Sequence, residues 1–191
     1  AWSALHIVAL SVRCCCCAAA SNLIVNPNFE QTILSNSHLA SNWSYVYQAG
    51  SVYSRVTDVV RPPATAALKY SNQDAKTYQI NVQDMPAAVA TAMAGRHFNA
   101  SAWIKTDNIT GADSGATIAV EWTGPGDGRG VPGAVCINQT ATGCETYLAG
   151  KYLDGITGTH DWSFISAVVQ IPDPVDSVRM DVYVRSGMVG V

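Results

Sequence analysis

The side chains of this chain that could do chemistry are amides, a carboxylate, a guanidinium and aromatic rings on alternate positions of strand-like segments. They are Gln79, Asn81, Trp103, Glu121, Tyr183 and Arg185. Successive residues of a strand point to opposite faces of the sheet, so each of these six side chains points away from the face that carries the apolar residues. Amide, carboxylate and guanidinium groups bind hydroxyls, and rings offer flat apolar faces. We predict that these side chains form one sugar-binding surface. The alternative is an ordinary solvated sheet face.

Catalytic residues do not form a recognisable pattern, although the chain has 14 acidic residues and 4 histidines. It contains no nucleophile elbow, no zinc-binding HExxH helix and no phosphate-binding glycine loop. A glycosidase needs two carboxylates that face each other, whereas Glu30, Glu121 and Glu145 lie on separate segments. His160 and Asp161 adjoin and would point apart on an extended chain. The prediction is that this chain is not an enzyme, with a catalytic domain beyond Val191 left open.

Short strands separated by turn residues must position these side chains. The predicted strands are 22–26, 44–48, 51–59, 66–70, 77–83, 97–105, 116–122, 163–171 and 177–185. Residues 85–95 are either one short helix or an Ala-rich loop, and 124–133 resembles an inserted glycine-rich loop. This spacing predicts an all-β, antiparallel β-sandwich (jelly roll) with at most one short helix.

Alternation within the strands assigns an inner row of side chains. The predicted inner row is Tyr78, Ile80, Val82, Phe98, Ala100, Ala102, Ile104, Ile118, Val120, Trp122, Ile165, Ala167, Val169, Ile171, Val178, Met180, Val182 and Val184. Gln83, Arg179 and Asp181 then fall on the outer row, together with the six candidates above. Tyr45, Tyr47 and Tyr152 are further candidates for stacking on a sugar.

Composition excludes some classes of partner. The chain has 191 residues, of which 48% are hydrophobic and 13% charged, and its net charge is -3. No cluster of Lys and Arg exists, so nucleic acid is not an expected partner. No apolar stretch is long enough to span a membrane convincingly.

Residues 1–20 have the pattern of a secretion signal. An apolar run from Ala4 to Leu10 is followed by four cysteines and by Ala18–Ala20, which suit a signal-peptidase site. A translated upstream sequence and a palmitoylated anchor are the alternatives. We predict a cleaved leader over 1–20, a single binding domain over 21–191, and a secreted protein.

Cysteines and sequons agree with secretion. Without the leader only Cys136 and Cys144 remain, and in an oxidising compartment we expect them to form a disulfide, the alternative being two free thiols. Four Asn-x-Ser/Thr sequons, at Asn42, Asn99, Asn108 and Asn138, are candidate glycosylation sites. A glycan on Asn99 would crowd the predicted sugar-binding face.

Several segments together resemble the CenC-type carbohydrate-binding modules, which have a galactose-binding-like jelly-roll fold. They are Asn-Leu-Ile-Val-Asn-Pro-Asn-Phe-Glu at 22–30, Ala-Leu-Lys-Tyr at 67–70, Ser-Ala-Trp-Ile-Lys-Thr at 101–106, and Gly-Lys-Tyr-Leu-Asp-Gly at 150–155 followed by Gly-Thr-His-Asp-Trp at 158–162. The resemblance runs from about residue 21 to Val191, where the family's last strand is incomplete. It implies a structural calcium bound partly by Glu30, whose alternative role is that of an ordinary strand-end carboxylate.

The prediction for function is carbohydrate (polysaccharide) binding by a secreted, non-catalytic module. One alternative is an accessory domain of a glycoside hydrolase or polysaccharide lyase whose catalytic domain lies outside this chain. The other is an extracellular structural or adhesion domain without sugar affinity. A polysaccharide pull-down separates the last alternative from the first two.

Overall fold

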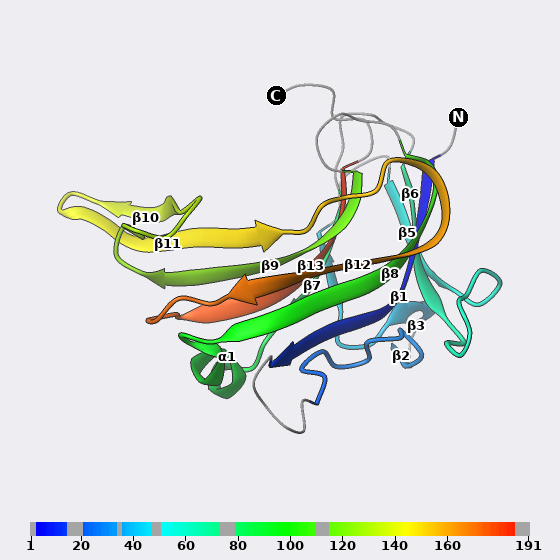
Figure 1. The fold of residues 1–191 in the computed structure, drawn as a ribbon, viewed down its shortest axis with the longest axis horizontal. Helices are drawn as coiled ribbons and strands as arrows, with labels where there is room; N and C mark the ends of the chain where they lie inside the picture. Colours follow the sequence, from blue (N-terminus) through cyan, green and yellow to red (C-terminus); the bar gives the residue numbers. More distant parts are fainter. Residues whose placement is uncertain are drawn as a thin grey trace.

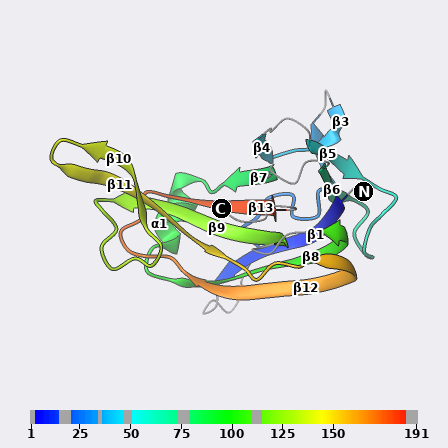
Figure 2. The same ribbon diagram turned by 90° about the horizontal axis from the view of Figure 1, so that it is seen from above.

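Two antiparallel sheets packed face to face make up most of the molecule (Figure 1). The computed structural model describes residues 3–14, 21–33, 36–46, 51–72, 79–109 and 115–185. Figure 2 shows the layers, with β12, β8 and β1 in one and β9, β13 and β7 in the other. The predicted all-β antiparallel sandwich is confirmed.

The strands are arranged in a five-stranded and a six-stranded sheet. In spatial order the five-stranded sheet consists of β12 (Gly158–Gln170), β8 (His97–Ile109), β1 (Ser3–Cys14), β6 (Ala67–Asn72) and β5 (Ser51–Val56). The six-stranded sheet consists of β10 (Val135–Thr140), β11 (Gly143–Tyr152), β9 (Gly115–Pro125), β13 (Ser177–Arg185), β7 (Gln79–Asp84) and β4 (Ser44–Val46). A small ribbon pairs β2 (Thr32–Ile33) with β3 (Asn36–Ala40). One helix, α1 (Ala87–Met93), occurs in the described part of the chain. The segment 85–95 therefore contains a short helix and is not an Ala-rich loop.

The core lies between the two sheets and follows the predicted alternation on most strands. Buried side chains of β8, β9, β12 and β13 include Phe98, Ala100, Ala102, Ile104, Ile118, Val120, Trp122, Val169, Val178, Met180 and Val182. Helix α1 adds Ala90 and Met93 at one end of the sandwich. Burial of these side chains supplies the main driving force for association of the sheets.

Strand β7 has the opposite alternation to the one predicted. Asn81 and Gln83 are 1% and 6% exposed, whereas Ile80 and Val82 are only half-buried. The inward amides have partners there: Tyr70 donates from its hydroxyl to Asn81 Oδ1 at 2.8 Å, and Gln83 Nε2 donates to the carbonyl of Val25 at 2.9 Å. Buried polar groups that are hydrogen-bonded in this way are tolerated in a core.

The predicted strand at 22–26 is absent, and the segment is a loop instead. Asn26 adopts a left-handed backbone with φ 50°. Its Oδ1 accepts a hydrogen bond from Gln31 N, and its Nδ2 donates to the carbonyls of Gln31 and Ser41. Such local side-chain bonds compete with a ladder and favour a turn.

Residues that we excluded from the fold as a leader form strand β1. It lies between β8 and β6 in the five-stranded sheet, and Val12 is fully buried. Setting the whole of 1–20 outside the sandwich was therefore wrong for Ser3–Cys14. The secretion signal itself stays a prediction, which a deletion considered in the Discussion tests.

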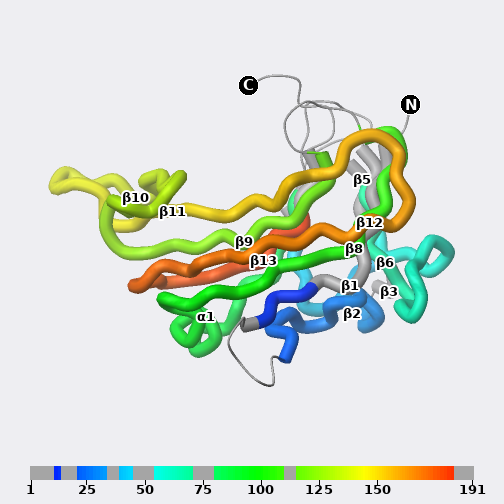
Figure 3. The backbone as a smooth tube through the Cα atoms, in the orientation of Figure 1, coloured from blue at the N-terminus to red at the C-terminus, as the bar shows by residue number. Residues whose placement is uncertain are grey.

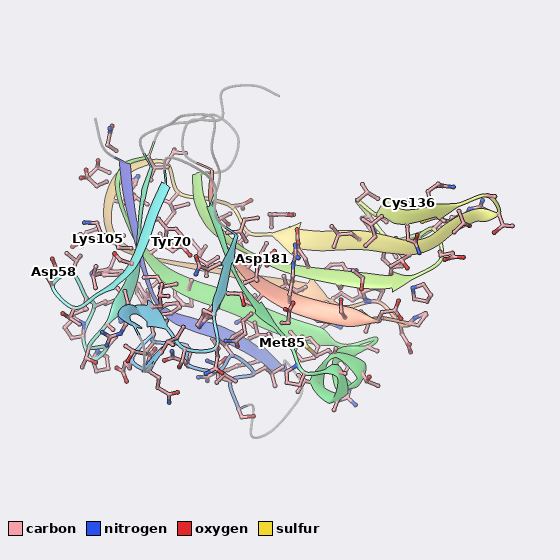
Figure 4. The ribbon with its side chains drawn as sticks, turned by 180° about the vertical axis from the view of Figure 1, so that it is seen from behind. Asp58, Tyr70, Met85, Lys105, Cys136 and Asp181 are labelled. Carbon is pink, nitrogen blue, oxygen red and sulfur yellow. A yellow bond between two sulfur atoms is a disulfide. The ribbon has the colours of Figure 1, made fainter. Side chains whose placement is uncertain are left out.

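The glycine-rich region interpreted as an inserted loop ends in a β-hairpin of β10 and β11, which projects beyond the body of the sandwich (Figure 3). Cys136 and Cys144 form a disulfide within this hairpin, which confirms the predicted pairing. Figure 4 shows Cys136 out on the hairpin and Asp181 in the body of the molecule.

Candidate functional site

A group of polar side chains lies on the outer face of the six-stranded sheet, and we call it the outer-face cluster: Glu121, Tyr152, Arg179 and Asp181. Arg179 and Glu121 are directly paired between β13 and β9. Tyr152 of β11 and Asp181 of β13 are both paired with Ala119 of β9, from its two sides. Because directly paired residues face the same side of a sheet, three neighbouring strands bring the cluster together.

Glu121 is the hub of the cluster. The Tyr152 hydroxyl donates to its Oε1, and the Arg179 guanidinium donates to its Oε2, with Nε at 3.0 Å. Gly150, paired with Glu121 on β11, leaves the space that the Glu121 side chain fills, because a Cβ there would lie 2.9 Å from Glu121 Cγ. Burial by itself would raise the pKa of Glu121, but the bonds from Tyr152 and Asp181 and the charge of Arg179 hold it below its ordinary value.

Asp181 is fully buried beside this ion pair. Its Oδ1 lies 3.3 Å from Nε of Arg179, yet within the described residues neither carboxyl oxygen accepts a hydrogen bond. Burial, followed by the negative charge of Glu121, raises the pKa of Asp181 to about 8. At neutral pH the cluster therefore holds one protonated and one ionised carboxyl group.

Arg179 and Tyr152 are the members of the cluster that meet the solvent. The Arg179 side chain is 38% exposed and Tyr152 is 43% exposed, whereas the Glu121 and Asp181 side chains are 7% and 1% exposed. A ligand at this face would contact the tyrosine ring and the guanidinium, which Glu121 holds in place from below. A ring beside an oriented donor group suits a hydroxylated ligand with apolar C–H faces.

The predicted common surface of six residues is not formed. Glu121 lies on the outer face of the six-stranded sheet, Asn81 points into the core, and Trp103 lies on the outer face of the other sheet. Gln79, Tyr183 and Arg185 belong to β7 and β13, but their side chains lie outside the described residues. The prediction failed because the side of a strand can be read from sequence, whereas the sheet to which the strand belongs cannot.

Trp103 packs in a small apolar cluster of its own. Its ring centroid lies 5.1 Å from that of Phe164, and Arg61 covers its ring at 3.5 Å in a cation–π contact. Val60 and Trp162 belong to the same cluster. The predicted outward direction of Trp103 is correct, and the ring is half-buried by these neighbours.

The sequons fall on several parts of the surface. Asn42, Asn99 and Asn138 are exposed, and Asn108 is half-buried. Asn99 lies two alternations from Trp103 on β8, and so shares the outer face of the five-stranded sheet. A glycan there would not cover the outer-face cluster, so the anticipated conflict does not arise. Glycosylation remains a prediction at all four positions.

Glu30 has protein partners in this structure, and the calcium site that the family resemblance implies stays a prediction. Its Oε1 accepts hydrogen bonds from the backbone N and the hydroxyl of Thr65, both at 3.2 Å. Arg55 donates to the backbone carbonyls of Phe29 and Glu30 at 2.6 and 3.3 Å. A guanidinium at these carbonyls supplies positive charge and would repel a cation. Within the described residues no three acidic, His or Cys side chains gather as a ligand set.

Substituting Arg55→Met is expected to destabilise the protein by about 1–3 kcal/mol, because two charge-assisted hydrogen bonds to the opening loop are lost. Urea unfolding measures the change, with Arg129→Met as the matched control, since Arg129 is 92% exposed in its ion pair with Asp127. The wild-type midpoint should be the same in calcium and in chelator. A lower midpoint in chelator would show instead that the opening loop binds calcium.

Sequence reasoning missed Arg179 and Asp181 as members of the site. Both were assigned correctly to the outer row of β13, but neither was selected as a candidate. The usable signal is two opposite charges at alternate positions of a strand whose other row is entirely apolar. Tyr152 was considered only for stacking, and its hydroxyl contact with Glu121 depends on the register of β11 against β9.

Comparison with known proteins gives a likeness of fold. No family model matches the chain, and no curated protein matches it significantly. A solved structure, the enzymatically active domain of tailspike protein 4 of bacteriophage CBA120, superimposes with a TM-score of 0.50 at 15% identity. The match covers 88% of this chain and 20% of the tailspike chain, so this chain spans about a fifth of that protein.

This comparison corrects one prediction. We expected the chain not to be an enzyme, and the solved structure that shares its fold is described as an enzymatically active domain.

No helix in the described ranges is long and apolar enough to cross a membrane. The chain is thus an all-β sandwich, built on a fold that also occurs in a part of a tailspike enzyme domain.

Proposed function

We propose that this chain binds carbohydrate, a hydroxyl-rich polysaccharide, at the outer-face cluster of the six-stranded sheet. The observation that carries the proposal is the pairing of two solvent-facing groups, the Tyr152 ring and the Arg179 guanidinium, over a buried carboxylate that contacts both. The contact fixes their positions before a ligand arrives, which lowers the entropy cost of binding.

The chemistry of the cluster suits a sugar better than an ion. Glu121 balances the charge of Arg179, so the guanidinium offers directed hydrogen bonds without a strong net field. The tyrosine ring offers an apolar face to sugar C–H groups. The similar fold in a tailspike enzyme domain and the motifs shared with CenC-type modules support the proposal, although neither identifies a ligand.

Secretion is part of the same proposal. The disulfide Cys136–Cys144 is of a kind that persists in an oxidising compartment. The exposed sequons at Asn42, Asn99 and Asn138 agree with it. Such a domain would either hold a catalytic domain of the same chain at its substrate or anchor a protein without a catalytic domain to polysaccharide. The sequence of the full-length reading frame distinguishes the two cases.

Binding is expected to depend on the Tyr152 ring. Tyr152→Ala should weaken polysaccharide binding about tenfold or more, whereas Tyr152→Phe keeps the ring, loses only its bond to Glu121 and should weaken binding by a smaller factor. Affinity electrophoresis of the full chain in gels containing xylan, mixed-linkage β-glucan, β-1,3-glucan or galactomannan measures the effect. Ile137→Ala is the control, because Ile137 is 54% exposed on the distant hairpin.

The proposed function fails if the folded wild-type protein is not retarded by any of these polysaccharides. It also fails if Tyr152→Ala and Ile137→Ala behave alike in the gel that retards the wild type. Circular dichroism of each variant confirms that it is folded before it is compared.

Catalysis is the second candidate function, because the solved structure with a similar fold is an enzymatically active tailspike domain. Glu121 and Asp181 are the candidate acid–base pair, since Glu121 has a lowered pKa and Asp181 a raised one. Incubation with each polysaccharide followed by measurement of new reducing ends tests it. Release that is lost in Glu121→Gln while this variant is still retarded by the polysaccharide would assign hydrolysis to the pair, and release that persists in this variant would exclude the pair.

A further inference from the structure

A groove of about 330 Å³ lies at one side of the sandwich, between the end of β11 and the edge strand β12. Lys151, Leu153 and Asp154 line it from β11 and the turn that follows. Phe164 and Ser166 line it from β12. The groove is distinct from the outer-face cluster, none of whose members lines it.

The groove combines an exposed ring with polar groups. Phe164 is 52% exposed although its ring also packs against Trp103. Lys151 and Asp154 are both exposed, and Ser166 contributes a hydroxyl. One flat ring beside a cation, a carboxylate and a hydroxyl offers both stacking and hydrogen bonds to a sugar.

The groove and the outer-face cluster meet across a single strand. Alternate residues of β11 face opposite sides, so Tyr152 contacts Glu121 on the outer face while its neighbours Lys151 and Leu153 line the groove. Strand β10 pairs with β11 only as far as Leu148, so among the described residues the end of β11 that carries Lys151 and Tyr152 is an open edge, round which a chain lying over Tyr152 can continue into the groove.

The charges of the two places indicate the kind of chain. Arg179 is balanced by Glu121 in the cluster, and the groove holds one lysine and one aspartate. Neither place has an excess of positive charge that would favour a uronate or a sulfated sugar.

We propose that the groove between β11 and β12 is a second carbohydrate subsite, which takes the continuation of a neutral polysaccharide chain bound at the outer-face cluster. This rests on the proposed function and adds that the ligand is an extended chain and is recognised at two places. Affinity should therefore rise with chain length until both places are occupied.

Isothermal titration with disaccharides and hexasaccharides of β-1,4-xylose, β-1,4-glucose, β-1,3-glucose and β-1,4-mannose tests the proposal on the full chain. For the hexasaccharide that binds, Phe164→Ala should weaken binding about tenfold, and it should leave the affinity for the matching disaccharide within about twofold. Lys151→Ala is a second groove variant at an exposed position, and its effect should have the same length dependence. Val168→Ala is the control, since Val168 is 59% exposed on β12 and does not line the groove.

The possible results separate the two proposals. If a hexasaccharide binds and Tyr152→Ala weakens it while Phe164→Ala and Lys151→Ala do not, the second subsite is wrong and the proposed function stands. If no hexasaccharide binds a folded wild type that a polysaccharide gel retards, the second subsite is wrong and the proposed function stands; if no polysaccharide retards it either, both are wrong. A hexagalacturonate that binds as tightly as the neutral hexasaccharide would show that the proposed preference for a neutral chain is wrong.

Discussion

Removal of residues 1–20 is expected to abolish cooperative folding, because the deletion takes a central strand out of the five-stranded sheet. Strand β1 pairs with β8 on one side and β6 on the other. Its loss leaves two open strand edges, which favours aggregation. The loss of both ladders and of buried Val12 is comparable with the whole stability of a typical domain, which is about 5–15 kcal/mol.

Urea unfolding of residues 21–191 beside the full chain measures this effect. Two point variants test single residues of β1. Val12→Ala should lower the free energy of unfolding by about 1–3 kcal/mol, while Arg13→Ala, at the next and exposed position, should change it little. If residues 21–191 unfold cooperatively with the free energy of the full chain, β1 is dispensable. That result would favour the cleaved secretion signal.

Replacement of Asp181 by Asn is expected to stabilise the protein increasingly as the pH rises. Asp181 has a folded pKa of about 8 against an ordinary value of 3.8, because burial and then Glu121 disfavour its charge. Between these values the folded state keeps a proton that the unfolded state releases, so this group makes stability fall with rising pH. Above about 8 the loss is complete, and Asn, which cannot titrate, avoids it.

The window from about pH 6 to about pH 9 isolates this effect, because Glu121, whose pKa is lowered, loses its stabilising contribution only at acid pH. The stability of wild type should fall relative to Asp181→Asn by about 3 kcal/mol across the window, at about 1.4 kcal/mol per pKa unit. Urea unfolding at both ends measures it. Asp58→Asn, in an exposed loop (Figure 4), is the control and should run parallel to wild type. If Asp181→Asn also runs parallel, Asp181 is ionised in the folded protein.

The cluster explains how a charged group comes to lie within a sheet at all. A buried pair is costly unless hydrogen bonds complete it, and Glu121 receives such bonds from both Tyr152 and Arg179. Within the described residues Asp181 accepts no comparable bonds, and its raised pKa keeps it protonated at neutral pH instead. The same arrangement holds the ring and the guanidinium that we propose for sugar binding, so stability and recognition share Glu121.

Alternation in β8, β9, β12 and β13 was predictable because each of these strands has at least three apolar side chains in succession on one row, and burial of that row fixes which side faces inward. In β7 one row is apolar (Ile80 and Val82) and the other carries amides (Asn81 and Gln83), and either row can be buried if it finds suitable partners. The amide row lies inward because Tyr70 and the opening loop supply partners for Asn81 and Gln83. Those partners are 11 and 58 residues away, so no local pattern could indicate them.

Local alternation and turn residues were enough to predict an antiparallel sandwich and the residues of four long strands that form its core. The pairing of Cys136 with Cys144 was expected only on the assumption that a leader takes away the other four cysteines. Which strands are neighbours is known from the fold alone. That order separates Trp103 from Glu121, joins Glu121 to Tyr152, Arg179 and Asp181, and places Ser3–Cys14 inside a sheet. The physical reason is that strand pairing is a contact between distant segments, whose free energy depends on both partners and is not encoded in either one alone.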